Sequence, residues 1–202
     1  MKVAITGGIG SGKSFVCRML EKHGISIYDC DEAAKRLMRT SVSLQQAISK
    51  AVGEEVFPEG RLDKTLLTRF IVASEENAQL IDSIVHPAVA QDFMLSGKDW
   101  LESAILFESN FCQRLVFDSI ICVTAPLELR LQRIMQRDGI SREKALAWIN
   151  RQMPQEEKLK LSDYEIKNDN EHNLQTQVEE TIRIINSKKI NNNNGDNTFN
   201  CR

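Results

Sequence analysis

Short apolar runs alternate with longer amphipathic segments along most of this chain. The runs have the length and composition of buried strands, and in chain order they are "KVAIT", "ISIYDCD", "DWLESAI", "DSIICVTA" and "YEIKN". Between them, apolar residues recur at helical spacing, as Val16, Met19 and Leu20 do after the first run. Strands separated by helices of this length predict an α/β fold with a five-stranded parallel sheet flanked by helices.

Residues that cap or break helices subdivide the helical segments. Gly24 is predicted to end the first helix, and Gly139 to end one that has Pro126 at its first position. Pro87, in "VHPAV", is predicted to interrupt a helix because proline removes a backbone donor. Helix N-caps are expected at four residues with short polar side chains: Ser43, Asp63, Ser74 and Ser141.

The helical segments also predict a domain organisation. Residues 41–98 are expected to be mostly helical. Because this segment is longer than a single crossover connection between two strands, it is interpreted as an inserted substrate-binding subdomain. Residues 1–40 and 99–188 would form the core, with a lid at about 138–160. The polar, asparagine-rich residues 189–202 are expected to be a poorly ordered tail.

Charge and cysteine content narrow the choice of partners. The 26 basic and 28 acidic residues nearly cancel, so we expect neither nucleic acid nor a membrane as the main partner. Cys17 and Cys122 lie in apolar runs and are interpreted as small core residues. No signal peptide or long apolar run is seen, which favours a soluble, cytoplasmic protein. The oligomeric state stays open.

The most specific motif is "GGIGSGKS", between the first strand and the first helix. Gly7, Gly12, Lys13 and Ser14 have the spacing G-x-x-x-x-G-K-[ST] of a phosphate-binding P-loop. Glycines let backbone N–H groups converge on a phosphate, and the helix dipole points to the same place. Lys13 would reach the β- and γ-phosphates, and the Ser14 hydroxyl could hold Mg²⁺. The motif predicts a P-loop NTPase fold that binds a nucleoside triphosphate.

Other features indicate which kind of P-loop protein this is. Guanine-selective proteins carry an N-K-x-D run, whereas this chain reads "IKNDN", and no long strand ends in Asp-Glu as in motor ATPases. A small-molecule kinase is therefore favoured. Asp29 and Asp31 are expected at the end of a strand beside the P-loop strand, pointing to the same side. One could accept a hydroxyl proton, while Asp31 could equally be a helix N-cap.

Arginines form a second candidate cluster. Arg130, Arg133 and Arg137 share one helical face, beside an apolar stripe of Leu127, Leu131 and Ile134. Such a row could neutralise charge in phosphoryl transfer, as part of a lid hinged at Gly139, or it could be a solvated face.

Several motifs together resemble the dephospho-coenzyme A kinase family. They are "GGIGSGKS", "YDCDEA", "HPAV", "LFES", "RDGISREKALAWINRQMPQEEK" and "EIKND", and they extend over roughly residues 1–185. The resemblance implies ATP-dependent phosphorylation of the ribose 3′-hydroxyl of dephospho-coenzyme A, with ATP and Mg²⁺. It also implies a five-stranded parallel core, a helical coenzyme-binding domain and a lid.

The resemblance also implies roles for individual residues. Asp31 would be the general base, with Asp29 near the acceptor and His86 in the coenzyme-binding domain, although His86 could also be a merely packed His-Pro corner. Arg137 would bind phosphates from the lid, and Asn168 would lie near the adenine. The phosphate-binding residues would be Ile9, Gly10, Ser11, Gly12, Lys13 and Ser14.

One stretch departs from the family pattern. After the third strand the family has D-x-P-L-L-x-E, whereas this chain reads "ESAILFE", with Glu102 for Asp and Ala104 for Pro. Glutamate keeps the charge, so Glu102 could still order Mg²⁺ through water. Two alternatives remain at this point: another small P-loop kinase for a nucleoside monophosphate or metabolite, and a non-enzymatic ATP-binding switch.

Overall fold

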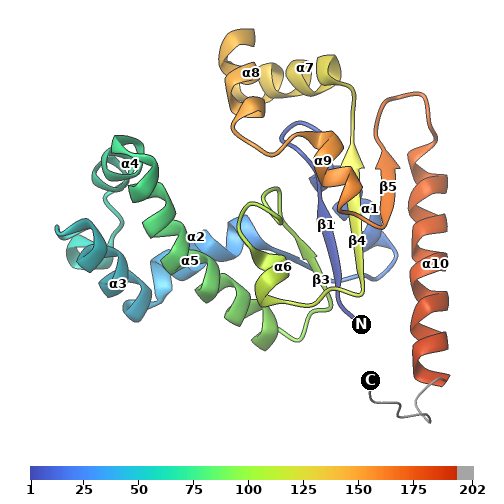
Figure 1. Cartoon of the computed structure of the whole chain (residues 1–202), viewed down its shortest axis with the longest axis horizontal. Coiled ribbons are helices and arrows are strands. Elements are labelled where there is room, and N and C mark those ends of the chain that lie inside the picture. Colours follow the sequence, from blue (N-terminus) through green and yellow to red (C-terminus); the bar gives the residue numbers. More distant parts are fainter. Residues whose placement is uncertain (195–202) are drawn as a thin grey trace.

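A computed structural model describes residues 1–194 and contains a parallel sheet with helices on both faces (Figure 1). Every pairing between neighbouring strands is parallel, in the order β2-β3-β1-β4-β5. This confirms the predicted five-stranded parallel sheet. The strands are β1 (Val3–Thr6), β2 (Ile27–Asp29), β3 (Trp100–Glu102), β4 (Ser119–Thr124) and β5 (Tyr164–Lys167).

The order of the strands corrects one expectation. β2 does not lie beside the P-loop strand β1, because β3 pairs with both of them, with Leu101 opposite Ala4 on one side and Tyr28 on the other. The chain returns from the helical insertion into the gap between β1 and β2. Hydrophobic runs predict that strands exist, but their neighbours are decided by long-range packing.

Alternating side chains bury both faces of the sheet. Val3 and Ile5 pack on one face in a cluster with residues of α1 (Lys13–Lys22) and α10 (Leu174–Asn194). Ala4 belongs to the cluster on the opposite face, together with residues of α2 (Cys30–Thr40) and α5 (Glu75–Leu95). Side chains that alternate in this way are the reason why short apolar runs in a two-sided sheet lack a polar face. Cys17 and Cys122 are buried, as predicted.

Helix α5 runs through Pro87, so the predicted interruption is wrong. Proline removes only its own backbone hydrogen bond and strains the preceding turn. The apolar side chains of Val85, Val89 and Phe93 are buried on either side of it. Their packing, at roughly 1.5–3 kcal/mol for each fully buried side chain, offsets the local cost. Tertiary contacts therefore keep the helix continuous.

Most of the predicted helix ends are confirmed. The side chains of Asp63, Ser74 and Ser141 accept backbone N–H bonds at the starts of α4 (Lys64–Ala73), α5 and α8 (Arg142–Asn150). Gly139 has φ of 64° at the end of α7 (Leu127–Asp138), and Gly24 has φ of 80° just after α1.

Two predicted helix starts are displaced by one or two residues. Ser41, not Ser43, caps α3 (Val42–Val52), because Ser41 has the extended backbone that directs its hydroxyl to the N–H of Leu44. Pro126 immediately precedes α7 and does not occupy its first turn position.

Three short helices and the end of the last helix complete the description. The short ones are η1 (Pro58–Gly60), α6 (Phe111–Arg114), which was not predicted, and α9 (Gln155–Lys160). Helix α10 continues to Asn194, so residues 189–194 are helical and are not part of a tail. The rest of the predicted tail, residues 195–202, lies outside the described residues.

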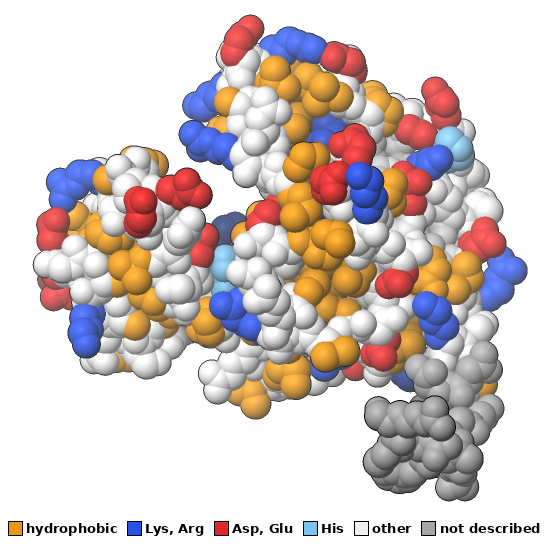
Figure 2. Space-filling view, in the orientation of Figure 1, with side chains coloured by type: hydrophobic (Ala, Val, Ile, Leu, Met, Phe, Trp, Pro, Cys, Tyr) orange, Lys and Arg blue, Asp and Glu red, His pale blue; other side chains and the backbone are white. Residues whose placement is uncertain are grey.

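The helices outside the sheet form two projecting lobes (Figure 1). One contains α3 and α4, and the other contains α7 and α8. Figure 2 shows that the surface is hollowed between these lobes, and that basic side chains lie along the edge of the α7–α8 lobe next to the hollow. Within residues 1–194, none of the helices combines the length and apolar character that a membrane crossing needs.

Candidate functional site

The P-loop lies against the carboxyl ends of β4 and β5, and its glycines make this close approach feasible. A Cβ on Gly7, whose φ is 145°, would lie 2.3 Å from the carbonyl oxygen of Val123. A Cβ on Gly12, whose φ is 91°, would lie 2.0 Å from the Asn168 amide nitrogen. Neither position tolerates a side chain. The glycines of the motif therefore allow the loop to pack on the sheet edge, in addition to leaving room for a phosphate.

Lys13 starts α1 and bends back across the loop. Its side chain is buried, with Nζ 3.5 Å from the carbonyl oxygen of Gly8 and 3.9 Å from Oε1 of Glu102. Burial lowers the pKa of Lys13, while the charges of Glu102 and Asp31 act in the opposite direction. The ammonium is therefore held under the loop, beside acidic side chains from β3 and from the start of α2, in the place where phosphate charge would be neutralised.

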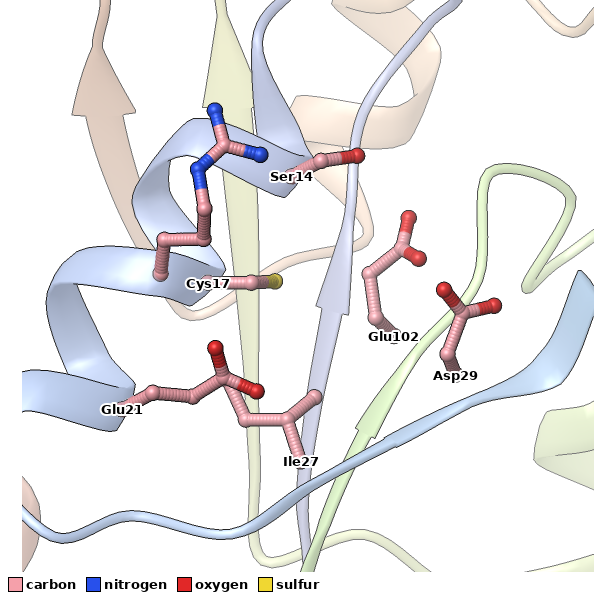
Figure 3. A pocket seen from close by; sticks show the side chains of 7 residues that line it. Ser14, Cys17, Glu21, Ile27, Asp29 and Glu102 are labelled. Carbon is pink, nitrogen blue, oxygen red and sulfur yellow. The ribbon is translucent and has the colours of Figure 1, made fainter. Parts of the chain in front are cut away.

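A cavity of about 180 Å³ opens next to the start of α1 (Figure 3). Ser14 and Glu102 extend towards each other in it, and Asp29 lies beside Glu102. Burial raises the pKa of Glu102 to about 7, against the opposing effect of Lys13. The negative charges of Asp29 and Asp31 contribute to the same rise in pKa. A cation in the cavity would thus favour the ionised form of Glu102.

The donors in this cavity fit Mg²⁺. Ser14, Glu102 and Asp29 offer only oxygen atoms, which Mg²⁺ prefers, and Mg²⁺ is commonly bound by one or two protein oxygens together with waters and substrate phosphates. Residues 1–194 contain no group of three or more His, Cys, Asp or Glu side chains placed to hold a metal by themselves.

Asp29 and Asp31 are arranged differently from the expectation. Strand β2 ends at Asp29, which is the N-cap of α2 and accepts the N–H of Glu32 at 2.9 Å. Asp31 already lies in the first helical turn. The two carboxylates are therefore not two positions of one strand, and Asp31 is not the cap. Asp29 lines the cavity beside Ser14, whereas Asp31 lines a second cavity.

The second cavity, of about 240 Å³, lies between α2, α4 and α5 and is mostly apolar. Asp31, Asp82, His86 and Ser103 supply polar groups among apolar side chains such as those of Ile81, Val85, Val89 and Phe111. His86 lies inside α5 rather than at a corner, and its burial lowers its pKa, opposed by Asp82. The lining of this cavity suits a partly apolar ligand with a polar group near Asp31.

The arginines of α7 divide into two groups. Arg130 is buried and donates from Nε to the carbonyl oxygen of Ile9 at 3.0 Å. Arg133 donates to the carbonyl oxygens of Gly10, Ser11 and Asn168. These two side chains hold the P-loop backbone.

Arg137 lies apart from the other two arginines. It pairs with Asp138 at 2.7 Å, and its side chain is 60% exposed. The apolar stripe is also incomplete, since Leu127 is 47% exposed.

Asn168 connects the loop after β5 to the P-loop. Its Nδ2 donates to the carbonyl oxygen of Ser11 at 2.9 Å, and Arg133 donates to its Oδ1 at 3.3 Å. The structure therefore brings Asn168 and the P-loop together, although they are far apart in sequence.

Sequence reasoning assigned no role to Glu108 or Lys158, which form an ion pair whose lysine is buried. Lys158 is fully buried in α9, and its Nζ lies 2.6 Å from Glu108 Oε1 and 2.6 Å from the carbonyl oxygen of Ala104. Glu108 also accepts the N–H of Met153 at 3.0 Å. The runs "LFES" and "EEK" contain these residues, but a lysine in a charged segment carries no local sign of burial. The pair attaches the segment after α8 to the loop after β3.

We expect Glu108→Ala to lower the free energy of unfolding by about 2 kcal/mol, because the buried ammonium of Lys158 loses its charged partner. Glu157→Ala is the matched control, since Glu157 forms an exposed pair with Lys160 and should leave stability nearly unchanged. Urea unfolding of the two variants measures the difference. Equal midpoints would show that the Glu108–Lys158 pair does not stabilise the fold.

A P-loop at the end of a parallel sheet, with a buried lysine and carboxylates at the same edge, defines the class of P-loop kinases. The comparisons with known proteins narrow this class. A family model described as dephospho-CoA kinase matches residues 1–174. The chain belongs to the dephospho-CoA kinase family, whose members are enzymes of coenzyme A biosynthesis.

Individual relatives agree with the family match. A dephospho-CoA kinase of Bacteroides fragilis is 42% identical over 195 residues, covering 93% of this chain and 94% of the relative. A crystal structure from Thermus thermophilus has a TM-score of 0.76 at 32% identity, covering 93% of this chain and 97% of that chain. The structure of dephospho-CoA kinase from Campylobacter jejuni has a TM-score of 0.64 at 27% identity, covering 94% and 100%.

Proposed function

We propose that this protein transfers the terminal phosphoryl group of ATP to the ribose 3′-hydroxyl of dephospho-coenzyme A, giving coenzyme A and ADP. The observation that carries the proposal is the family match over residues 1–174, which include the lining residues of both cavities. We infer that the protein acts in the cytoplasm, because the cytoplasm supplies the ATP for this reaction.

The donor would be bound by the P-loop. The backbone N–H groups of residues 9–14 and the Lys13 ammonium surround the place for the phosphates, at the positive end of the α1 dipole. Ser14 and Glu102 would hold Mg²⁺, which neutralises phosphate charge when it is bound with the nucleotide. Arg130 and Arg133 keep the loop in shape through its carbonyl oxygens.

The acceptor would occupy the second cavity, with its ribose near Asp31. Asp31 would take the proton from the 3′-hydroxyl as the oxygen attacks the phosphorus, and the bond from phosphorus to the ADP oxygen breaks. Asp29 would lie beside the acceptor, and His86 would contact it from the helical insertion, residues 41–98. The apolar walls suit the pantetheine arm, which has few charges.

The lid would be formed by residues 138–160, next to α7. Arg137 would turn from Asp138 to the phosphates when the lid closes, because its exposed pair with Asp138 is easily exchanged. Asn168 would contact the adenine side of the nucleotide, since it lies against the P-loop. Closure of the lid would exclude water from the phosphoryl group that is being transferred.

Mass spectrometry of dephospho-coenzyme A after incubation with ATP and Mg²⁺ tests the proposal. We expect the mass to rise by one phosphate, and a 3′-deoxy analogue to gain none. Adenosine monophosphate and shikimate serve as alternative acceptors. Phosphorylation of either one in place of dephospho-coenzyme A would favour another small kinase, and ATP binding without any transfer would favour a binding switch.

A further inference from the structure

The segment between α8 and α9 contacts the P-loop directly. In Figure 1 this part of the chain lies beside the loop that leaves β1. The N–H of Ile9 donates to Oε1 of Gln152 at 2.7 Å. Ile9 is in the first half of the P-loop, whose backbone N–H groups are the ones that bind phosphate oxygens. A lid side chain therefore occupies a donor that a phosphate oxygen would use.

Gln152 is placed by an anchor at the residue that follows it. The next residue, Met153, donates its N–H to Glu108, which is bound to the buried Lys158. Gln155 accepts the N–H of Ala125, at the end of β4, at 3.0 Å. Because the bond from Met153 to Glu108 holds the backbone directly beside Gln152, the position of Gln152 above the loop does not depend on the side chain of Gln155.

The carboxamide of Gln152 can form a hydrogen bond with a bound anion as well as with the backbone N–H of Ile9. It has one acceptor oxygen and an NH₂ group with two donors. Among residues 1–194, Oε1 bonds with Ile9, and no side-chain or backbone acceptor bonds with Nε2. The last torsion of glutamine has two broad minima, so a half-turn exchanges oxygen and nitrogen at small cost. After that turn the same side chain donates to an oxygen bound at Ile9.

We propose that Gln152 recognises the terminal phosphate of the bound nucleotide and so distinguishes a triphosphate from a diphosphate. The start of α1 holds the inner phosphates, while Ile9 lies in the earlier half of the loop, on the lid side. A phosphate at Ile9 would be the terminal one. This role is separate from the choice of acceptor, since it rests only on nucleotide binding at the P-loop.

Titration calorimetry with ATP and ADP, each with Mg²⁺ and without an acceptor, tests the role. In Gln152→Glu the carboxylate still accepts from Ile9 but cannot donate, and it repels the phosphate. We expect its affinity for ATP to fall at least tenfold more than its affinity for ADP. Gln152→Met has a side chain of the same length with neither donor nor acceptor. We expect its ratio of ATP affinity to ADP affinity to fall about threefold to fivefold, because one hydrogen bond is lost.

Gln155→Ala is the matched control, because it removes the same type of side chain and the same type of bond to a backbone N–H in the same segment. It should keep the wild-type ratio of the ATP and ADP affinities. An unchanged ratio in folded Gln152→Glu, or an equal change in Gln155→Ala, would overturn the proposal. If Gln152→Glu does not fold, Gln152→Met decides by the same criterion. None of these outcomes depends on dephospho-coenzyme A being the acceptor.

Discussion

Lys13→Ala is expected to slow phosphoryl transfer by at least about 10²-fold, the largest effect of any single change considered for this protein. The ammonium lies under the P-loop, 3.5 Å from the Gly8 carbonyl oxygen, and is already dehydrated. A preorganised charge in a buried site stabilises the charge that develops on the phosphate more strongly than a hydrated charge does. Single-turnover measurements with saturating ATP report the transfer step itself.

Lys22→Ala is the matched control for this prediction. Lys22 lies at the other end of the same helix and is exposed, so its removal changes the net charge equally and leaves the loop untouched. We expect wild-type turnover for it. The fold should survive in Lys13→Ala, because the loop backbone is also held by Arg130 and Arg133. Normal turnover by a folded Lys13→Ala protein would remove the P-loop lysine from the chemistry.

Asp31→Asn is expected to slow turnover by about 10²-fold while ATP binding and melting temperature stay close to wild type. A general base contributes about 10²–10⁴-fold, and a loose phosphoryl transition state favours the lower part of this range, since proton removal is late. The cap of α2 is Asp29, so the change at Asp31 removes no capping bond. Asparagine keeps the size of the side chain and loses only the ability to take the proton.

Glu32→Gln separates the role of a base from a general charge effect. Glu32 is the next carboxylate in the first turn of α2, and it is exposed and paired with Lys35. It interacts with the helix dipole as Asp31 does but does not line the second cavity. We expect Glu32→Gln to keep the wild-type rate. If Asp31→Asn also keeps it, the base lies elsewhere, and Asp29 becomes the next candidate.

Local sequence patterns predicted the features that depend on neighbours along the chain. The P-loop, its following helix and the caps at Asp63, Ser74 and Ser141 each involve residues only a few positions apart. Their physical causes, such as a hydroxyl or carboxylate near a free N–H, are complete within one turn of chain. The five strands were predicted for the same reason, because burial on both faces leaves an apolar run that can be read locally.

Errors arose wherever distant packing outweighed a local preference. Pro87 is a helix breaker by itself, yet the buried side chains around it keep α5 continuous. Asp29 and Asp31 have the spacing of one strand face, but β2 ends at Asp29 and α2 begins there. A strand that ends two residues earlier than expected sends the two carboxylates to separate cavities.

The sequence alone determined the class of the protein: a parallel sheet, a phosphate-binding loop with Lys13 and Ser14, and a set of motifs characteristic of one kinase family. Only the tertiary structure decided that β3 separates β2 from β1, that Arg130 and Arg133 hold the loop, and that Gln152 reaches Ile9. Contacts of this second kind join residues far apart in the sequence, from Tyr28 opposite Leu101 in the sheet to Gln152 and Ile9, which are 143 positions apart. Because their energy comes from burial and from the exclusion of water, which form only when the whole chain is folded, no local pattern records them.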